Sequence, residues 1–501
     1  MKKTLCLLLA TLLSAGSLSL LSCSESRENA EPSSPAADTP AEDVQPSEAE
    51  AAETEPDRAH VPDNLPELDF GGATAVIHSR GDDESVNEVA VEELTGEAVS
   101  DSVYERNNMV ADRLNVKIEV FAGDGWENYN STVSGLRSSI MSADGAYDII
   151  AGWSARIPSL SLEGLFLDYT KLPYIDLEKP WWNDSVASEL LIGNKLYFIT
   201  GDIARTMLSA MCVYAFNQKV AVDEQVENLY DVVNERRWTI DYVYDLTSKV
   251  HADLDGNGKA DQTDYWGLVT SSVNDADGYM QGSLVSMVTR DEEGYPVLSV
   301  DEERMADLVS RVYRLMWENE GCFAITGDGT NIQDTLAQDK ALLATTRLSA
   351  VVSNLGDMES DYGILPYPLQ DASQPHYGTR VQDAVSLWCV PIDAKNSDLS
   401  CAVMEALAAQ SWRTTTPVYF DMALKSRYSR DPETSAMMDL IKDSVLINFE
   451  SLYNESIGNP WFVLRTLMPQ KKDNFSSYWA GNKKVINKTL EKAMDKIRAL
   501  D

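Results

Sequence analysis

Residues 253–264 bring acidic and amide side chains together at a spacing that suits a metal ion. The segment reads Asp-Leu-Asp-Gly-Asn-Gly-Lys-Ala-Asp-Gln-Thr-Asp. Calcium prefers oxygen ligands, and a loop of this kind presents them around a sharp turn made by a glycine, which is Gly258 here. The predicted ligands are Asp253, Asp255, Asn257, the carbonyl of Lys259, Asp261 and Asp264.

The flanks of this loop depart from a helix-loop-helix calcium site. Thr239 is a suitable N-cap for a helix over Ile240–Val250, but Tyr265–Leu268 after the loop is typical of a strand. Asp264 is also shorter than the glutamate that usually closes such a loop. A merely acidic surface turn is the alternative, and a bound calcium would brace the fold rather than do chemistry.

Easily recognised catalytic motifs are absent from the sequence. It contains no His-Glu-x-x-His, no Gly-x-Ser-x-Gly and no Gly-x-x-x-x-Gly-Lys-Ser/Thr. A glycoside hydrolase needs only two suitably spaced carboxylates, so this class of enzyme stays open as an alternative. A surface adhesion module braced by calcium is a third reading.

Strands and helices alternate along the first part of the body. Strands are expected at Thr74–Ile77, Val116–Val120 and Tyr147–Ile150, with helices over Ser100–Leu114 and Trp126–Met141 between them. This order predicts an α/β fold with a mainly parallel sheet flanked by helices. Ligands of such sheets bind beyond the carboxyl ends of the strands, which points to Arg80 and to Trp153 with Ser154.

The N-terminus has the order of an export signal. Lys2 and Lys3 precede an apolar run over 5–21, and Leu20-Leu21-Ser22-Cys23 resembles the lipobox of bacterial lipoproteins. Residues 1–23 are therefore expected to be a signal peptide, with a lipidated Cys23 at the mature N-terminus. An uncleaved anchor or an ordinary signal peptide is the alternative; each reading places the body outside the cell.

Residues 24–64 are rich in Glu, Asp, Ala, Pro and Ser and poor in residues that could be buried. Such a composition predicts a disordered linker. About 40 flexible residues span roughly 30 to 40 Å, which is enough for the body to move near a membrane.

The net charge limits the possible partners of the body, and the spacing of the cysteines bears on disulfides and metal binding. A net charge of −39 disfavours nucleic acid and anionic membrane surfaces as partners of the body. Cys212, Cys322, Cys389 and Cys401 are widely spaced and form no Cys-x-x-Cys pair, so buried thiols are expected rather than disulfides or metal ligands.

The chain resembles the extracellular solute-binding proteins of ABC sugar importers, the maltose-binding-protein-like family. The resemblance rests on the order of several stretches: 179–183, 193–202, 214–217, 253–268, 363–368, 424–425 and 430–431. It implies a two-lobed periplasmic-binding-protein-like fold (type II) with a ligand cleft at the hinge. It also implies that residues 65–208 and 365–412 form lobe I, and that residues 209–364 and 413–501 form lobe II.

The family implies a monomeric binding protein, not an enzyme, which delivers a mono- or oligosaccharide to an ABC permease at the membrane. It would act as a lipid-anchored protein on the extracellular or periplasmic face. Sugars bind against aromatic faces, with Asp, Asn and Arg bonding to hydroxyl groups. The candidate ligand-binding residues are Arg80, Trp153, Asp202, Arg205, Trp266, Arg347 and Tyr377. Each has an alternative role in the core or in an ion pair, and Trp181, Trp182 and Trp388 are expected to serve packing.

Overall fold

The first strands and helices follow the predicted order. A computed structural model describes residues 58–183, 188–327, 332–356, 358–426 and 431–500. Strands β1 (Ala73–Ser79), β2 (Val116–Ala122) and β3 (Ile149–Trp153) alternate with helices α2 (Ala98–Leu114) and α3 (Tyr129–Ser142). The predicted boundaries agree to within about three residues, because each apolar run is closed by a polar or glycine-containing turn.

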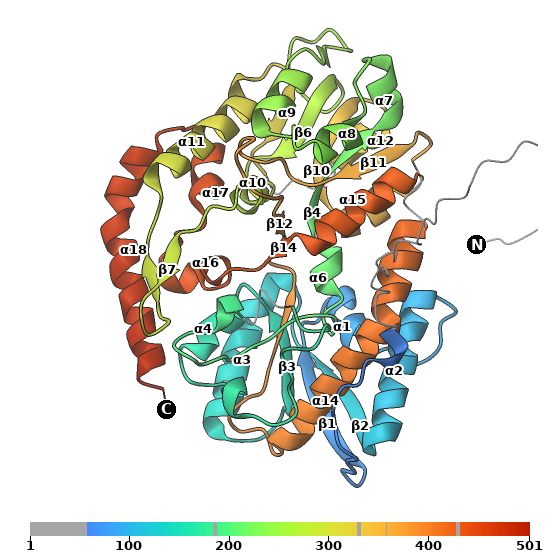
Figure 1. Ribbon diagram of the computed structural model, residues 1–501, viewed down its shortest axis with the longest axis vertical. Helices are drawn as coiled ribbons and strands as arrows, with labels where there is room; N and C mark the ends of the chain where they lie inside the picture. The colour runs from blue at the N-terminus through green and yellow to red at the C-terminus, as the bar shows by residue number, and fades with distance from the viewer. Residues whose placement is uncertain (1–57, 184–187, 328–331, 357, 427–430, 501) are drawn as a thin grey trace, which may run out of the picture. The chain divides into compact units, whose positions relative to one another are not determined.

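These strands form the first sheet, in the order β13-β3-β1-β2. Strand β1 pairs in parallel with β2 and β3, whereas β13 (Ser386–Cys389) runs antiparallel to β3. Helices α2 and α14 (Ser397–Gln410) pack against each other, and α3 lies across the sheet from α2 (Figure 1). Ala75, Ile77, Ile149 and Ile150 are fully buried, so both faces of the sheet are covered.

The second sheet is mixed rather than mainly parallel. Its order is β11-β4-β10-β6-β5, and β9 pairs with β6. Pairs β10·β6 and β6·β9 are parallel, whereas β10·β4, β11·β4 and β5·β6 are antiparallel. Two of the antiparallel pairs involve β4, where the chain enters from the first sheet, and the third joins β5 and β6 on either side of the 253–264 loop. The strands are β4 (Cys212–Asn217), β5 (His251–Ala252), β6 (Tyr265–Ser271), β9 (Cys322–Ile325), β10 (Ala341–Arg347) and β11 (Tyr362–Leu365).

Helices surround the second sheet and continue into the C-terminal part of the chain. Around the sheet lie α7 (Gln218–Asp223), α8 (Leu229–Asn234), α9 (Ile240–Thr247), α10 (Ala276–Gly282), α11 (Glu302–Tyr313), α12 (Gln333–Ala337) and α15 (Pro432–Asp443). The C-terminal part contains β14 (Val445–Leu446), α16 (Phe449–Leu452), α17 (Val463–Leu467) and α18 (Phe475–Arg498). Strand β14 pairs with β12 (Thr379–Arg380), and β7 (Val288–Arg290) forms a hairpin with β8 (Pro296–Leu298).

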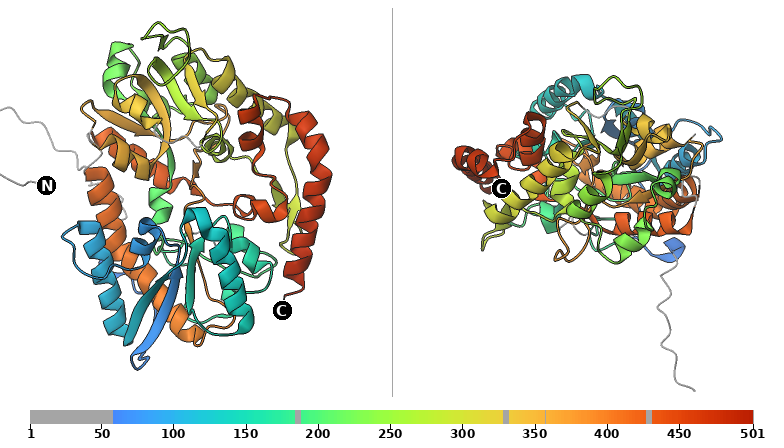
Figure 2. Two further views of the ribbon diagram at one scale, coloured as in Figure 1. Left: turned by 180° about the vertical axis from the view of Figure 1, so that it is seen from behind. Right: turned by 90° about the horizontal axis from the view of Figure 1, so that it is seen from above.

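The chain crosses between the two sheets three times. It passes through α6 (Thr206–Ser209) to β4, through β12 to β13, and through the helix that continues α14 to α15 (Figures 1 and 2). The first crossing directly follows the turn over residues 201–205. We call the part built on the first sheet lobe I and the part built on the second sheet lobe II.

The folded part begins inside the predicted linker. Asp63 is 6% exposed and pairs with Arg113 at 2.6 Å and with Arg413 at 3.4 Å. Arg58 lies 5.3 Å from the ring of Trp412. Residues 58–64 therefore belong to the body, because two arginines far along the chain hold a carboxylate that local composition assigns to the linker.

The four cysteines within the described residues are free thiols, as predicted. Cys212, Cys389 and Cys401 are buried and Cys322 is half-buried. Within the described ranges, no helix is long and apolar enough to span a bilayer. The predicted signal peptide and Cys23 lie outside the described residues.

The adjacent tryptophans Trp181 and Trp182 are packing residues, and both are held by one buried carboxylate. Glu405 on α14 accepts hydrogen bonds from the two indole nitrogens at 3.0 and 2.9 Å. Burial raises the pKa of Glu405 to about 7, although the indole and backbone donors around it act in the opposite direction. The folded state therefore binds a proton here more tightly than the unfolded chain does.

This shift predicts a pH-dependent stability. As pH rises from 4.5 to 7, the unfolded chain loses the Glu405 proton first, so the free energy of unfolding falls by about 3 kcal/mol. Glu405→Gln removes this contribution, and urea unfolding of both proteins across this window measures it. A variant with the same pH dependence as the wild type would show that Glu405 is ionised in the fold.

Candidate functional site

A cavity of about 180 Å³ lies between the lobes at the carboxyl end of β3. Lobe I contributes Trp153, Ser154 and Arg156, which follow the strand directly, and the second crossing contributes Arg380 and Asp383. The C-terminal part of the chain forms the third wall with Leu446, Ile447, Ser451, Leu452, Asn454, Glu455, Trp461, Phe462 and Arg465. Gln281 of α10 also lines the cavity, which is thus enclosed by four parts of the chain that are distant in sequence.

Trp153 is held at the cavity by aromatic neighbours. Its backbone N–H donates to the hydroxyl of Tyr129 at 3.0 Å, and its ring meets those of Tyr129 and Trp126 edge to face at 5.5 and 4.9 Å. The guanidinium of Arg156 lies 5.0 Å from the indole ring. These contacts fix the indole as a rigid apolar surface on the lobe I side.

Four charged side chains from three segments meet beside the cavity. Arg380 pairs with Asp277 at 3.4 Å and with Asp383, and Arg465 pairs with Asp383 at 3.5 Å and with Asp277. Asp277 is fully buried and Arg380 is 4% exposed. Burial opposes ionisation of Asp383, but the charges of Arg380 and Arg465 outweigh it and lower the pKa of this carboxyl.

The charge cluster also reaches lobe I. The hydroxyl of Ser154 donates to the Asp383 carbonyl at 2.7 Å, and the backbone N–H of Ser154 donates to the Val385 carbonyl. The end of β3 is therefore joined to the same crossing segment that carries Arg380 and Asp383. One network positions side chains on all three walls.

The walls combine apolar rings with hydrogen-bonding groups. Phe462 carries the Arg465 guanidinium 4.1 Å from its ring, and Trp461 is almost fully buried next to it. Within the described part of the chain, the indole nitrogens of Trp153 and Trp461 have no hydrogen-bond partner. Such a mixture suits a polar solute that has apolar ring faces.

Of the predicted ligand-binding residues, Trp153 lines this cavity. Arg80 supports it indirectly, because its buried guanidinium lies 3.5 Å from the ring of Trp126 and donates to the Ala384 carbonyl. Asp202 lies in the first crossing, where burial raises its pKa to about 6 against the effects of Thr416, Lys442 and Arg58. Arg205 donates to the Glu84 carbonyl at 3.1 Å and lies over the ring of Tyr419.

The other three candidates have partners elsewhere in the fold. Trp266 stacks between His251 and Phe323 in the second sheet. Arg347 is exposed and donates to Gln382. The hydroxyl of Tyr377 donates to the Val233 carbonyl at 2.9 Å.

Several lining residues were missed by sequence reasoning. Arg380 and Asp383 precede the apolar run of β13 by a few residues. The sequence feature that could have identified them is a pair of opposite charges in a segment that crosses between the lobes. Trp461, Phe462 and Arg465 follow a turn at Asn459-Pro460 and carry no local sign of a ligand site. Only the tertiary fold brings them to the cavity.

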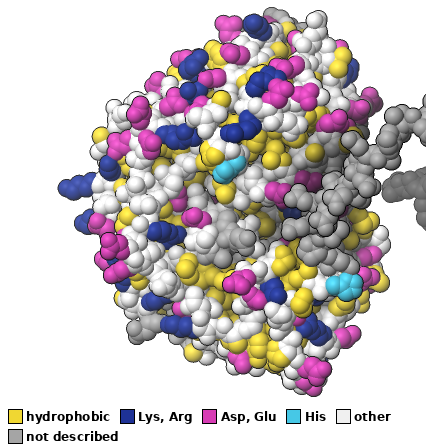
Figure 3. Space-filling view, in the orientation of Figure 1, with side chains coloured by type: hydrophobic (Ala, Val, Ile, Leu, Met, Phe, Trp, Pro, Cys, Tyr) yellow, Lys and Arg dark blue, Asp and Glu magenta, His cyan; other side chains and the backbone are white. Residues whose placement is uncertain are grey.

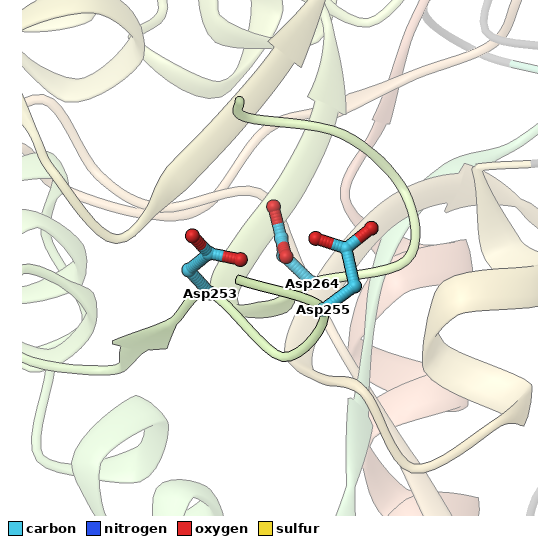
Figure 4. Close-up of side chains that lie close together, drawn as sticks. All are labelled: Asp253, Asp255 and Asp264. Carbon is cyan, nitrogen blue, oxygen red and sulfur yellow. The ribbon is translucent and has the colours of Figure 1, made fainter. Parts of the chain in front are cut away.

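The acidic loop is separate from the cavity, and its carboxylates converge. Oxygen atoms of Asp253, Asp255 and Asp264 lie within 4.8 Å of one another, and the side chains point towards a common centre (Figure 4). Asp264 is fully buried and accepts hydrogen bonds from the backbone N–H groups of Leu254 and Asp261. Asp253 and Asp255 are exposed.

The remaining predicted ligands of the loop are engaged within it. Asp261 accepts a hydrogen bond from the Thr263 hydroxyl at 2.6 Å, and Asn257 accepts one from the Lys259 N–H at 2.6 Å. As expected, α9 precedes the loop with the Thr239 side chain as its N-cap, and β6 follows it. The geometry offers three carboxylates to a cation.

Comparison with known proteins identifies the fold. No protein-family model and no curated protein sequence matches the chain. Among solved structures, a cyclo/maltodextrin-binding protein complexed with maltotetraose matches with a TM-score of 0.53 at 12% identity, over 85% of this chain and 96% of that one. The GacH receptor of Streptomyces glaucescens, solved unliganded and with acarbose, matches with a TM-score of 0.51 at 13% identity, over 86% and 100%.

A third match extends the range of solutes bound by this fold. UgpB from Mycobacterium tuberculosis, in complex with glycerophosphocholine, has a TM-score of 0.51 at 11% identity, over 78% of this chain and 95% of that one. At these identities the likeness establishes the architecture. The chain has the two-lobed α/β fold of these binding proteins.

Loss of an ion pair in the charge cluster should lower the free energy of unfolding more than loss of an exposed ion pair. Asp277→Asn leaves the guanidinium groups of the buried Arg380 and the half-buried Arg465 with one carboxylate fewer, so the free energy of unfolding should fall by about 3 kcal/mol. Arg237→Ala breaks exposed pairs with Glu227 and Glu235 and should leave it nearly unchanged. Urea unfolding of both variants checks this, and equal losses would contradict the assigned role of the cluster.

Proposed function

We propose that the chain is an extracellular solute-binding protein. It captures a small solute, a carbohydrate, between its two lobes and delivers it to the permease of an ABC importer. The observation that carries this proposal is the cavity between the lobes, which combines aromatic walls with side chains that bond to hydroxyl groups. The maltotetraose and acarbose complexes of proteins with the same fold support a carbohydrate as the solute.

The carboxylates of the cavity favour binding over hydrolysis. A glycosidase needs one carboxylic acid that keeps its proton to protonate the leaving group. Among the lining residues, Asp383 is paired with two arginines, and Glu455 pairs with Arg156 at 2.6 Å. Asp383 is therefore held as an anion and Glu455 is engaged in an ion pair, so we propose that the protein is not an enzyme. The alternative hypothesis, an adhesion module braced by calcium, gives the cavity between the lobes no role.

The proposed mechanism is a shift between open and closed forms. A solute that contacts both lobes binds the closed form better, and this difference in affinity shifts the population towards closure. The closed form then docks on the permease as a monomer. Acidic side chains are interspersed with basic ones over the face shown in Figure 3, which suits a protein that stays soluble outside the cell.

The location of the protein follows from its first residues. We propose that the lipoprotein signal is cleaved directly before Cys23, and that lipid on Cys23 anchors the protein to the membrane. Residues 24–57 then serve as the tether. Mass spectrometry of the mature N-terminus distinguishes a diacylated Cys23 from an unmodified chain.

We also propose that the loop over 253–264 binds calcium. The converging oxygens of Asp253, Asp255 and Asp264 support this, because mutual repulsion of three carboxylates is relieved by a divalent cation. The bound ion would join the loop to the buried start of β6 and brace lobe II.

Sugar binding should depend on Trp153. Titration of the soluble chain with a panel of mono- and oligosaccharides, followed by tryptophan fluorescence, should give a saturable change without cleavage products. Trp153→Ala should weaken binding by about tenfold or more, since a stacked ring face is lost. Trp266→Phe, in the second sheet, serves as the control with unchanged affinity. Release of products would favour the hydrolase, and a panel without any response would refute the carbohydrate assignment.

Calcium should raise the stability of the protein. At a hundredfold excess over its Kd, one bound ion adds about 2.7 kcal/mol to the free energy of unfolding. Asp255→Asn should remove most of this gain, whereas Asp245→Asn, an exposed acid on α9, should keep it. Thermal unfolding with calcium and with a chelator measures both, and an identical wild-type midpoint in the two conditions would exclude the site.

A further inference from the structure

The C-terminal helix is attached to both lobes. Near its start, the Trp479 indole nitrogen and the Lys483 ammonium both bond to Glu302 at the start of α11 in lobe II. Near its end, the Lys195 ammonium of lobe I donates to the carbonyls of Ile497 and Leu500. Helix α18 therefore spans from one lobe to the other.

The segment that precedes this helix also contacts lobe I. The hydroxyls of Tyr453 and Ser161 are 2.9 Å apart, and the Tyr453 ring lies 5.7 Å from that of Phe198. Glu455 forms its ion pair with Arg156 at the rim of the cavity. These contacts reach α4 (Ile157–Ser161), its N-cap residue Arg156 and the segment around Phe198.

The β7–β8 hairpin adds a third attachment. Arg290 donates to the Leu191 carbonyl at 3.0 Å, and the Gly193 N–H donates to the Gly294 carbonyl at 3.3 Å. A Cβ atom at Gly193 would lie 2.3 Å from the Tyr295 ring, so the close approach of the hairpin to lobe I requires glycine there. Glu450 ties the hairpin to α16 by accepting the Met287 N–H at 2.9 Å.

These attachments lie on the opposite side of the lobes from the third crossing. In Figure 1 the helices α14 and α15 of that crossing are on the right and α18 is on the left, and Figure 2 shows the same separation from behind. A pair of lobes joined only at a hinge can open freely on the other side. Here chain contacts join them on both sides.

We infer that residues 446–500 and the β7–β8 hairpin act as a clasp, which holds the lobes together opposite the hinge and must part from lobe I before the cavity opens. Half of the cavity lining, nine of eighteen residues, comes from residues 446–465, so release of the clasp exposes the cavity directly. The holding role stands on the contacts alone. The control of solute entry rests on the proposed function.

The clasp contacts are of a kind that can break and re-form. Their polar part consists of single hydrogen bonds and one ion pair with a half-exposed partner. Their apolar part consists of side chains such as Tyr453 and Ile497, which belong to the same buried cluster as Phe198 of lobe I. All of these contacts are non-covalent, whereas the three crossings are covalent. The clasp therefore holds the closed form in the absence of solute and can still part from lobe I.

Distance measurements between spin labels test the clasp without any solute. Met141 on α3 is 70% exposed and Val222 on α7 is 75% exposed, so Met141→Cys and Val222→Cys place one label on each lobe. Cys322→Ala removes the least buried native thiol. We expect one narrow distance distribution, and a second, longer population after Tyr453→Phe, Glu455→Ala and Lys195→Ala are combined.

Two further variants are measured beside the triple variant. Arg237→Ala, which breaks exposed ion pairs within lobe II, should leave the distribution unchanged. Lys195→Ala alone should also produce the longer-distance population, but with a smaller fraction of molecules. This single variant replaces the triple variant if a melting curve shows that the triple variant does not fold. A folded clasp variant with the wild-type distribution would overturn the inference, while leaving the solute-binding proposal untouched.

Discussion

The need to neutralise Asp277 constrains the rest of the structure. A fully buried carboxylate is unfavourable unless cations reach it, and here two arginines do so from different segments. Arg380 comes from the second crossing and Arg465 from α17, and Asp383 balances the second positive charge. Because all four groups must be in place together, the crossing strand and the C-terminal part of the chain have one acceptable arrangement.

The cavity and the clasp follow from this arrangement. Fixing Arg465 also fixes Phe462 and Trp461, which form the wall opposite Trp153. The residues just before this wall lie along lobe I, where Tyr453 and Glu455 have their partners. A buried ion cluster of this type contributes more to a defined geometry than to net stability.

Local sequence patterns predicted the elements but not the site as a whole. Alternating apolar residues located β1, β2 and β3, and the rule that ligands bind beyond strand ends selected Trp153. The antiparallel pairs of the second sheet depend on how distant strands meet, which no local period encodes. Arg347 and Tyr377 are suitable residue types for a sugar site, but they lie elsewhere in the fold.

The wall formed by residues 446–465 shows why such a site is hard to predict from the sequence. Its side chains reach the cavity through ion pairs with residues about 80 to 190 positions away, as the Arg465 contacts with Asp383 and Asp277 show. Composition also assigned Asp63 to a disordered linker, although Arg113 and Arg413 bury it. In both cases the deciding partner lies far along the chain.

A crystal structure of the protein with a bound sugar tests the central claim most directly. The account predicts an intact sugar between the lobes, with a ring face on Trp153 and hydrogen bonds to side chains of the C-terminal wall. A sugar bound at another surface, or one cleaved in the cavity, would contradict it.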